Sequence, residues 1–192
     1  MSYLPYITPY SILISVIPIP IFWYFFRLRF ISLFLGIVAL FIAYFMELGE
    51  EMLLGAGSLM LMLVFLAPVI EELCKFLMTY YKKDIKASIG VGLGFATIEN
   101  AMYYSSLSPI VSLSTLFAFR EFQDPILHST TTSVSVRTWK KGYPFIIISI
   151  GMHSLYNIVS IYNNLLYMIV ISLAYLSILI FLFIKSKNKN NT

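Results

Sequence analysis

The segment "VFLAPVIEELCKFLMTYYKK", residues 64–83, begins as an apolar run and then carries two glutamates, a cysteine and a lysine. Only two tyrosines and the basic pair at 82–83 indicate its end. An apolar stretch of about 20 residues is typical of a transmembrane helix. An ionisable side chain at the bilayer centre costs about 2.5–3.5 kcal/mol on insertion scales. This cost predicts that the ionisable side chains within the membrane helix either form ion pairs or have a function. These side chains are Glu71, Glu72 and Lys75.

The composition of the whole chain is that of a membrane protein. Of 192 residues, 59% are hydrophobic and 11% are charged, and the mean hydropathy is +0.86. Soluble domains carry about 25% charged residues. The first apolar run has no cationic segment before it and no cleavage pattern after it, which favours an uncleaved span over a signal peptide. The single cysteine, Cys74, excludes an internal disulfide framework, and we interpret it as an apolar packing residue.

The apolar runs predict an all-α, polytopic transmembrane bundle of about seven helices in a single integral membrane domain, residues 1–192. We expect the functional core at about 53–162 and a short solvated tail at 185–192. The fourth and fifth runs are rich in Gly, Ser and Thr. The alternative of five crossing helices with a membrane-embedded hairpin over 87–135 therefore stays open. The predicted spans are 10–26, 30–46, 53–80, 87–106, 110–135, 143–162 and 165–184.

The basic residues follow alternate spans, which with seven spans puts them on one side of the membrane. Glu47, Glu50 and Glu51 fall on the other side. Because lysine and arginine favour cytoplasmic loops, we expect a multi-pass protein of the cell membrane with its N-terminus outside and its C-terminus cytoplasmic. The net charge of +4 is then a matter of topology, and no nucleic-acid partner is expected. The basic groups are Arg27 and Arg29; Lys82, Lys83 and Lys86; Arg137, Lys140 and Lys141; and Lys185, Lys187 and Lys189.

Four of the predicted helices each place an ionisable group at a similar depth. At about 1.5 Å per residue, each group lies roughly 14–20 Å from the basic residues at one end of its helix. That depth is near the middle of a hydrocarbon core about 30 Å thick. Such groups usually face a bundle interior or a hydrated cavity. The four residues are Glu71, Glu99, His128 and His153, which include both histidines of the chain.

Polar residues four apart extend these positions into stripes, each on one helix face. Pro68 and Pro125 each precede a stripe residue by three positions, and a proline within a helix removes a backbone hydrogen bond. We expect kinks there that open a wet pocket. Two stripes also allow a purely structural reading, as ion pairs that lock helices together. The stripes are Glu71 and Lys75; Arg120, Asp124 and His128; and His153 and Asn157.

Four motifs in this order resemble the PrsW family of intramembrane proteases, distant relatives of the CAAX-processing type II prenyl endopeptidases and ABI proteins. They are "EELCK" (71–75), "GFATIEN" (94–100), "REFQDPILH" (120–128) and "HSLYN" (153–157). In the CAAX branch the second motif ends in histidine and the first in E-E-x-x-x-R. Glu99 and Lys75 occupy those positions here, which favours the PrsW branch. The resemblance implies a membrane-protein substrate, such as a single-pass anti-sigma factor.

Hydrolysis of a peptide bond in lipid needs water, a base and donors for the oxyanion. We expect Glu71 or Glu72 to be the base. His153 and Asn157 are suited to polarising the scissile carbonyl, and His128 to orienting water or protonating the leaving amine. Glu99 completes the expected catalytic group. Supporting positions are expected at Lys75, Asn100, Arg120 and Asp124.

Two alternatives stay open at this stage. The first is zinc, held by His128 and His153 with Glu71 or Glu99, because two imidazoles and a carboxylate form a known catalytic zinc shell. The metal-free glutamate version needs no cofactor and is slightly preferred, since the chain has no H-E-x-x-H motif. The second is a transporter or a scaffold or immunity-type binder that uses the same buried polar pocket without proteolysis.

Overall fold

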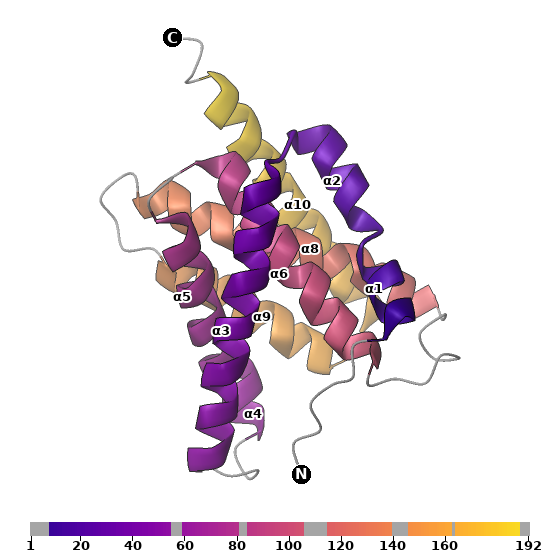
Figure 1. The fold of residues 1–192 in the computed structure, drawn as a ribbon, viewed down its shortest axis with the longest axis vertical. Helices are drawn as coiled ribbons and strands as arrows, with labels where there is room; N and C mark the ends of the chain where they lie inside the picture. The colour runs from indigo at the N-terminus through magenta and orange to yellow at the C-terminus, as the bar shows by residue number, and fades with distance from the viewer. Residues whose placement is uncertain are drawn as a thin grey trace.

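The computed structural model describes residues 8–54, 59–80, 84–105, 115–139, 146–162 and 164–188, and these residues are all-helical without a strand. The helices form seven segments (Figure 1). The first segment is α1 (Pro9–Ser15) with α2 (Pro18–Phe26), and the third is α4 (Leu59–Leu61), a π-helical turn η2 (Met62–Leu66) and α5 (Ala67–Thr79). The others are α3 (Phe30–Leu54), α6 (Ile85–Ser105), α8 (Thr115–Trp139), α9 (Ile146–Ile161) and α10 (Leu165–Asn188).

Each predicted span overlaps one of these segments, and the parts at 55–58, 106, 110–114 and 143–145 lie outside the described residues. The seventh helix, α10, continues four residues past the predicted end at 184. Two larger differences concern the first and second spans. The first span is interrupted, because Pro18 lacks an N–H and its ring would meet the carbonyl of Ile14 in a continuous helix. The chain instead makes a tighter turn there, and Ile17 N donates to Ile14 O at 3.0 Å. The second span is longer than predicted, since α3 continues to Leu54. The expected loop with Glu47, Glu50 and Glu51 is therefore wrong, and these glutamates lie on the last turns of α3.

Within the described residues, three helical stretches are long and apolar enough to cross a membrane, at 9–26, 30–53 and 165–188. Their outer faces carry exposed large apolar side chains, for example Phe45 (67% exposed) on α3 and Phe181 (59%) on α10. A soluble protein rarely exposes such faces over a large area, so they are consistent with contact with lipid.

The helices α6 and α8 are less apolar because protein, not lipid, surrounds them. Ile89, Val91, Leu93 and Phe95 of α6 are completely buried, since α6 packs against both α3 and α8. At about 1.5 Å per residue the 21 residues of α6 and the 25 of α8 extend roughly 31 and 37 Å. Each is thus long enough by length alone to cross the bilayer, although neither is among the three apolar stretches.

Two glycines let the central helices approach each other closely. A Cβ at Gly36 of α3 would collide with the backbone of α6 at Val91, and one at Gly92 of α6 with the backbone of α8 at His128. Small residues at such crossings are common in membrane proteins. Gly92 therefore sets the distance between α6 and the backbone of α8 at His128.

Six of the eight described lysines and arginines gather at one end of the bundle, and the other two are Lys75 and Arg120. One buried cluster includes Leu28, Ile85, Val136 and Phe183. Each of them is within two residues of a lysine or arginine in the sequence, so these basic residues share one end of the bundle. In Figure 1 that end is at the top, where α3 begins and α10 finishes. Which side of a membrane it faces stays a prediction, and residues 82, 83, 140, 141 and 189 lie outside the described residues. The group comprises Arg27, Arg29, Lys86, Arg137, Lys185 and Lys187.

Candidate active site

A proline and an asparagine together shape the helix that carries the first motif. In the π-helical turn before α5, Ala67 N donates to Met62 O, one residue further back than in an α-helix. In the same pattern Leu63 O would accept from residue 68, but Pro68 has no N–H. Asn157 of α9 supplies the missing donor, with Nδ2 at 2.8 Å from Leu63 O. Asn157 therefore joins α9 to the widened turn, a contact that its predicted oxyanion role did not include.

Lys75 is the buried centre of the site. Its side chain has no exposed surface, and its Nζ lies 2.6 Å from Glu72 Oε1 and 3.6 Å from Glu71 Oε2. Nζ also lies 2.6 Å from His128 Nδ1 and 4.4 Å from the centre of the Phe95 ring. The i,i+4 spacing predicts Glu71 as the nearer partner, but the shorter contact is to Glu72, because the Lys75 side chain turns toward α8.

Glu72 is the orienting carboxylate for His153. It is completely buried, and its Oε1 accepts from Thr131 Oγ1 at 2.9 Å and from His153 Nδ1 at 3.0 Å. An ionised carboxylate can only accept, so Nδ1 of His153 carries the proton. The other ring nitrogen, Nε2, then presents its lone pair toward Glu71 Oε2, 3.9 Å away.

His128 is held in the opposite tautomer. A lysine ammonium can only donate, so the contact with Lys75 makes Nδ1 of His128 an acceptor. Nε2 therefore carries the proton, and it lies 2.7 Å from Glu99 Oε2 in an ion-pair contact. The sequence placed Glu99 in the catalytic group without a partner, and the structure pairs it with His128.

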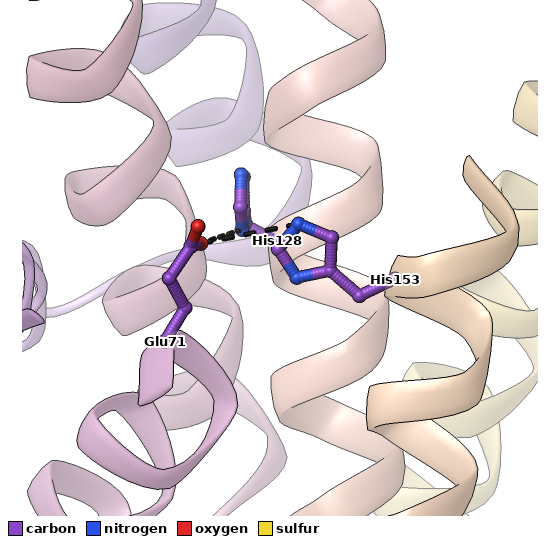
Figure 2. Close-up of side chains that lie close together, drawn as sticks. All are labelled: Glu71, His128 and His153. Carbon is purple, nitrogen blue, oxygen red and sulfur yellow. Dashed lines mark ion pairs between the residues drawn. The ribbon is translucent and has the colours of Figure 1, made fainter. Parts of the chain in front are cut away.

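Glu71 is the carboxylate between the two rings. Its Oε2 lies 3.9 Å from a nitrogen of each histidine, and the rings themselves are 5.1 Å apart at 83°. Figure 2 shows the three side chains pointing toward one another from α5, α8 and α9. Glu71 Oε2 is buried and has no hydrogen-bond partner among the described residues.

The site opens into a cavity of about 520 Å³ among α3, η2, α5, α6, α8 and α9. Glu71 is in its wall, whereas Glu72 and Lys75 lie behind the wall. The structure thus distinguishes the two glutamates that the sequence left equivalent. The polar part of the wall consists of Tyr44, Glu47, Glu71, Glu99, Tyr103, Arg120, Asp124, His128, His153, Tyr156, Asn157 and Ser160.

A second polar group lies beside the first along the same wall. Arg120 Nε is 2.9 Å from Asp124 Oδ2, so the predicted i,i+4 ion pair is confirmed. The guanidinium also lies 3.8 Å from Glu99 Oε1 and 3.4 Å from Asn100 Oδ1. Tyr156 OH donates to Asp124 Oδ1 at 2.8 Å. Arg120 thereby holds Glu99 from the side opposite His128.

The structure brings all predicted site residues into this one region and adds three that the sequence did not single out. Thr131 lies one turn after His128, so helical spacing could have placed it next to the site. Tyr156 gave no signal, because aromatic residues are common throughout this chain. Glu47 was assigned to a loop, since its position depends on where α3 ends.

Glu71, His128 and His153 could hold a metal ion, because each offers a ligand atom within 4.8 Å of the others. Ligands about 2.0–2.1 Å from a tetrahedral zinc lie roughly 3.4 Å apart, so the 3.9 Å contacts would need to contract. His153 fits well, since its other nitrogen already binds a carboxylate. His128 fits less well, because Lys75 and Glu99 occupy its two nitrogens.

Comparisons with known proteins leave the site to be judged on its own geometry. No family model, no curated protein and no solved structure matches the chain.

Proposed function

We propose that the protein is a multi-pass intramembrane endopeptidase that hydrolyses a peptide bond of a membrane-protein substrate. One observation supports this proposal above the others. Glu71, whose Oε2 has no hydrogen-bond partner among the described residues, stands between two imidazoles at the wall of a 520 Å³ cavity. Hydrolysis needs a base, polarising groups and room for water and substrate at one place.

In the proposed reaction Glu71 removes a proton from a water molecule while the water oxygen attacks the scissile carbonyl carbon. The carbonyl π bond opens and leaves a tetrahedral oxyanion. Glu71 then returns the proton to the leaving nitrogen, the C–N bond breaks, and a carboxyl and an amine product form. His153, whose Nε2 has only a lone pair in this tautomer, can accept a hydrogen bond from the attacking water, so its predicted role in polarising the carbonyl does not fit this tautomer. His128 with its Nε2 proton can donate to the oxyanion or to the leaving amine when it exchanges Glu99 for the substrate.

Lys75 favours the metal-free version of this chemistry. Its ammonium already supplies a positive charge next to Glu71, Glu72 and His128. A bound metal would instead require Lys75 to leave His128 Nδ1. Elemental analysis of the purified, active protein separates the two versions. Stoichiometric zinc whose removal stops cleavage would overturn the metal-free version.

We also propose that the chain belongs to the PrsW type of protease. The supporting observation is that the four motifs meet at one cavity, with "EELCK" supplying Glu71, Glu72 and Lys75 and the other three supplying their partners. The expected substrate is accordingly a single-pass membrane protein such as an anti-sigma factor. The expected orientation has the basic end of the bundle in the cytoplasm.

A proton-coupled transporter is the second candidate, and one observation favours it. An unbroken series of contacts runs from Arg120 through Glu99, His128, Lys75 and Glu72 to His153, and buried series of this kind mark proton relays. A transporter would show ion flux through liposomes and no cleaved product.

Reconstitution in liposomes with a panel of single-span substrates tests the proposal, with products read by mass spectrometry. Wild type is compared with the site variants Glu71→Gln, Glu72→Gln, Glu99→Gln, His128→Ala and His153→Ala. Glu51→Gln, an exposed change of the same charge on α3, is the matched control. We expect product from wild type and Glu51→Gln, and a loss of at least about 10²-fold in Glu71→Gln. Equal product from all site variants would remove the proposed site.

A further inference from the structure

The cavity wall has more acidic than basic side chains. Four carboxylates line it, at Glu47, Glu71, Glu99 and Asp124, whereas Arg120 is the one lysine or arginine among the described wall residues. Lys75 adds a positive charge behind the wall, but its shortest carboxylate contact is to a fifth carboxylate, Glu72. Buried charges are costly unless they are paired. The wall is therefore incompletely neutralised by its own side chains.

Glu47 is the wall carboxylate for which the structure gives no ion pair. Asp124 has Arg120, Glu99 has His128 and Arg120, and Glu71 has Lys75. Glu47 Oε1 is buried and has no hydrogen-bond partner among the described residues. Glu71 Oε2 is also without such a partner, and Glu71 is only 8% exposed. Glu99 Oε2 and Asp124 Oδ2 on the same wall also lack hydrogen-bond partners among the described residues, but both have ion-pair contacts. Four wall oxygens thus lack hydrogen-bond donors, and Glu47 Oε1 lacks an ion pair as well, which indicates a ligand that donates hydrogen bonds and carries positive charge.

No described lysine or arginine forms an ion pair with Glu47, and Lys75, whose charge reaches Glu47, has its shortest carboxylate contact with Glu72. Glu50 and Glu51 follow it on α3, and the six described basic residues of the helix ends lie at the opposite end of the bundle. The bundle therefore has a positive end and a negative end, and the cavity extends from the site toward the negative end.

The face of α3 that lines the cavity presents apolar side chains followed by a carboxyl group, an arrangement that suits a long basic side chain. Leu40, Ala43, Tyr44 and Glu47 line the wall at i, i+3, i+4 and i+7, so they share one face. Lysine and arginine bury their methylene stems against apolar surface while the charged head reaches a polar partner. Leu40 and Ala43 offer that apolar surface, and Glu47 offers the partner at its end. A cavity of about 520 Å³ lies within the range of about 300–1,000 Å³ that is usual for ligand sites.

We propose that Glu47 is the specificity residue of a subsite for a lysine or arginine of the substrate, close to the scissile bond. This inference rests on the proposed peptidase function for its substrate class. It assigns the substrate a positively charged residue on the side of the cleaved bond that faces the negative end of the bundle. Glu47 acts by binding and takes no part in bond breaking.

The experiment uses the full-length protein in liposomes and single-span peptides that differ at one position. A lysine, an alanine or a glutamate is placed at successive positions on each side of the cleaved bond, and kcat/KM is measured by mass spectrometry. Binding of fluorescent forms of the same peptides is measured in parallel by anisotropy. Wild type is compared with Glu47→Gln, with the charge reversal Glu47→Lys, and with the exposed control Glu51→Gln.

At one position we expect lysine to be preferred over alanine by at least about tenfold in both binding and kcat/KM. Glu47→Gln is expected to lose that preference while it still cleaves the alanine peptide, and Glu47→Lys is expected to prefer glutamate. Glu51→Gln is expected to keep the wild-type preference. Cleavage without any preference for lysine, or a preference unchanged in Glu47→Gln, would overturn the subsite and leave the peptidase function intact. Selective binding of lysine peptides without cleavage would retain the subsite and overturn the peptidase function.

Discussion

Replacing Lys75 by methionine tests the buried contacts of its ammonium with Glu72 and His128. Methionine is close to lysine in length and keeps the packing against Phe95, so the change removes mainly the ammonium. The ammonium makes 2.6 Å contacts with Glu72 Oε1 and His128 Nδ1, and none of the three side chains is more than 1% exposed. The substitution therefore strands a carboxylate in a dry environment.

Removing one partner of a buried ion pair costs about 3–5 kcal/mol. For a chain of this size one kcal/mol shifts the melting temperature by about 2–4 °C, so Lys75→Met is expected to lower it by roughly 6–20 °C. Glu72→Gln removes the stranded charge and keeps an oxygen that can accept from His153 and Thr131. The double variant is therefore expected to lose less than half as much stability as Lys75→Met alone.

Thermal unfolding in one detergent, followed by tryptophan fluorescence, measures all variants. Lys187→Met is the control, because Lys187 is exposed near the end of α10 and such surface changes stay within about 0.5 kcal/mol. A melting temperature of Lys75→Met equal to that of the control would refute the reasoning. So would a double variant that is as unstable as the single one.

Two further predictions concern the backbone around the site. Asn157→Leu leaves the Leu63 carbonyl without a donor and is expected to cost about 1–3 kcal/mol in thermal unfolding. The cost is expected to shrink in a Pro68→Ala background, where residue 68 regains an N–H, and an undiminished cost would contradict this account of the turn. Gly92→Ala is expected to cost about 1–3 kcal/mol and to slow cleavage, because its Cβ collides with the α8 backbone. Gly151→Ala, whose Cβ meets nothing within 4 Å, is the control, and equal effects would contradict the close crossing.

The meeting of four helices at one depth could be predicted from sequence because the rise of a helix is constant. Counting residues from the basic helix ends was enough to align Glu71, Glu99, His128 and His153. The i,i+4 rule likewise predicted the contact of Arg120 with Asp124. Both inferences use distances along a single helix, which do not depend on how the helices pack.

What the sequence left open depends on the rotation and the ends of helices. Glu71 and Glu72 are adjacent and about 100° apart on α5, so only the packing of α5 decides that Glu71 faces the cavity. Glu47 enters the cavity wall because α3 extends further than its apolar run. Asn157 binds Leu63 because η2 widens before Pro68, and a π-helical turn has no simple pattern in sequence.

The proposed site depends on His128 and His153 being in opposite tautomers, because the tautomers determine which protonated or unprotonated nitrogens face Glu71 and the cavity. The chain contains only two histidines, so ¹⁵N-histidine labelling gives two ring systems, and His153→Ala assigns them. Solid-state NMR in lipid at alkaline pH reads the tautomer of each ring directly. We predict a proton on Nε2 of His128 and on Nδ1 of His153. In Glu72→Gln we predict a changed hydrogen bond to residue 72 for the His153 ring only. Two rings in the same tautomer, or rings that exchange freely with water, would contradict the site described above.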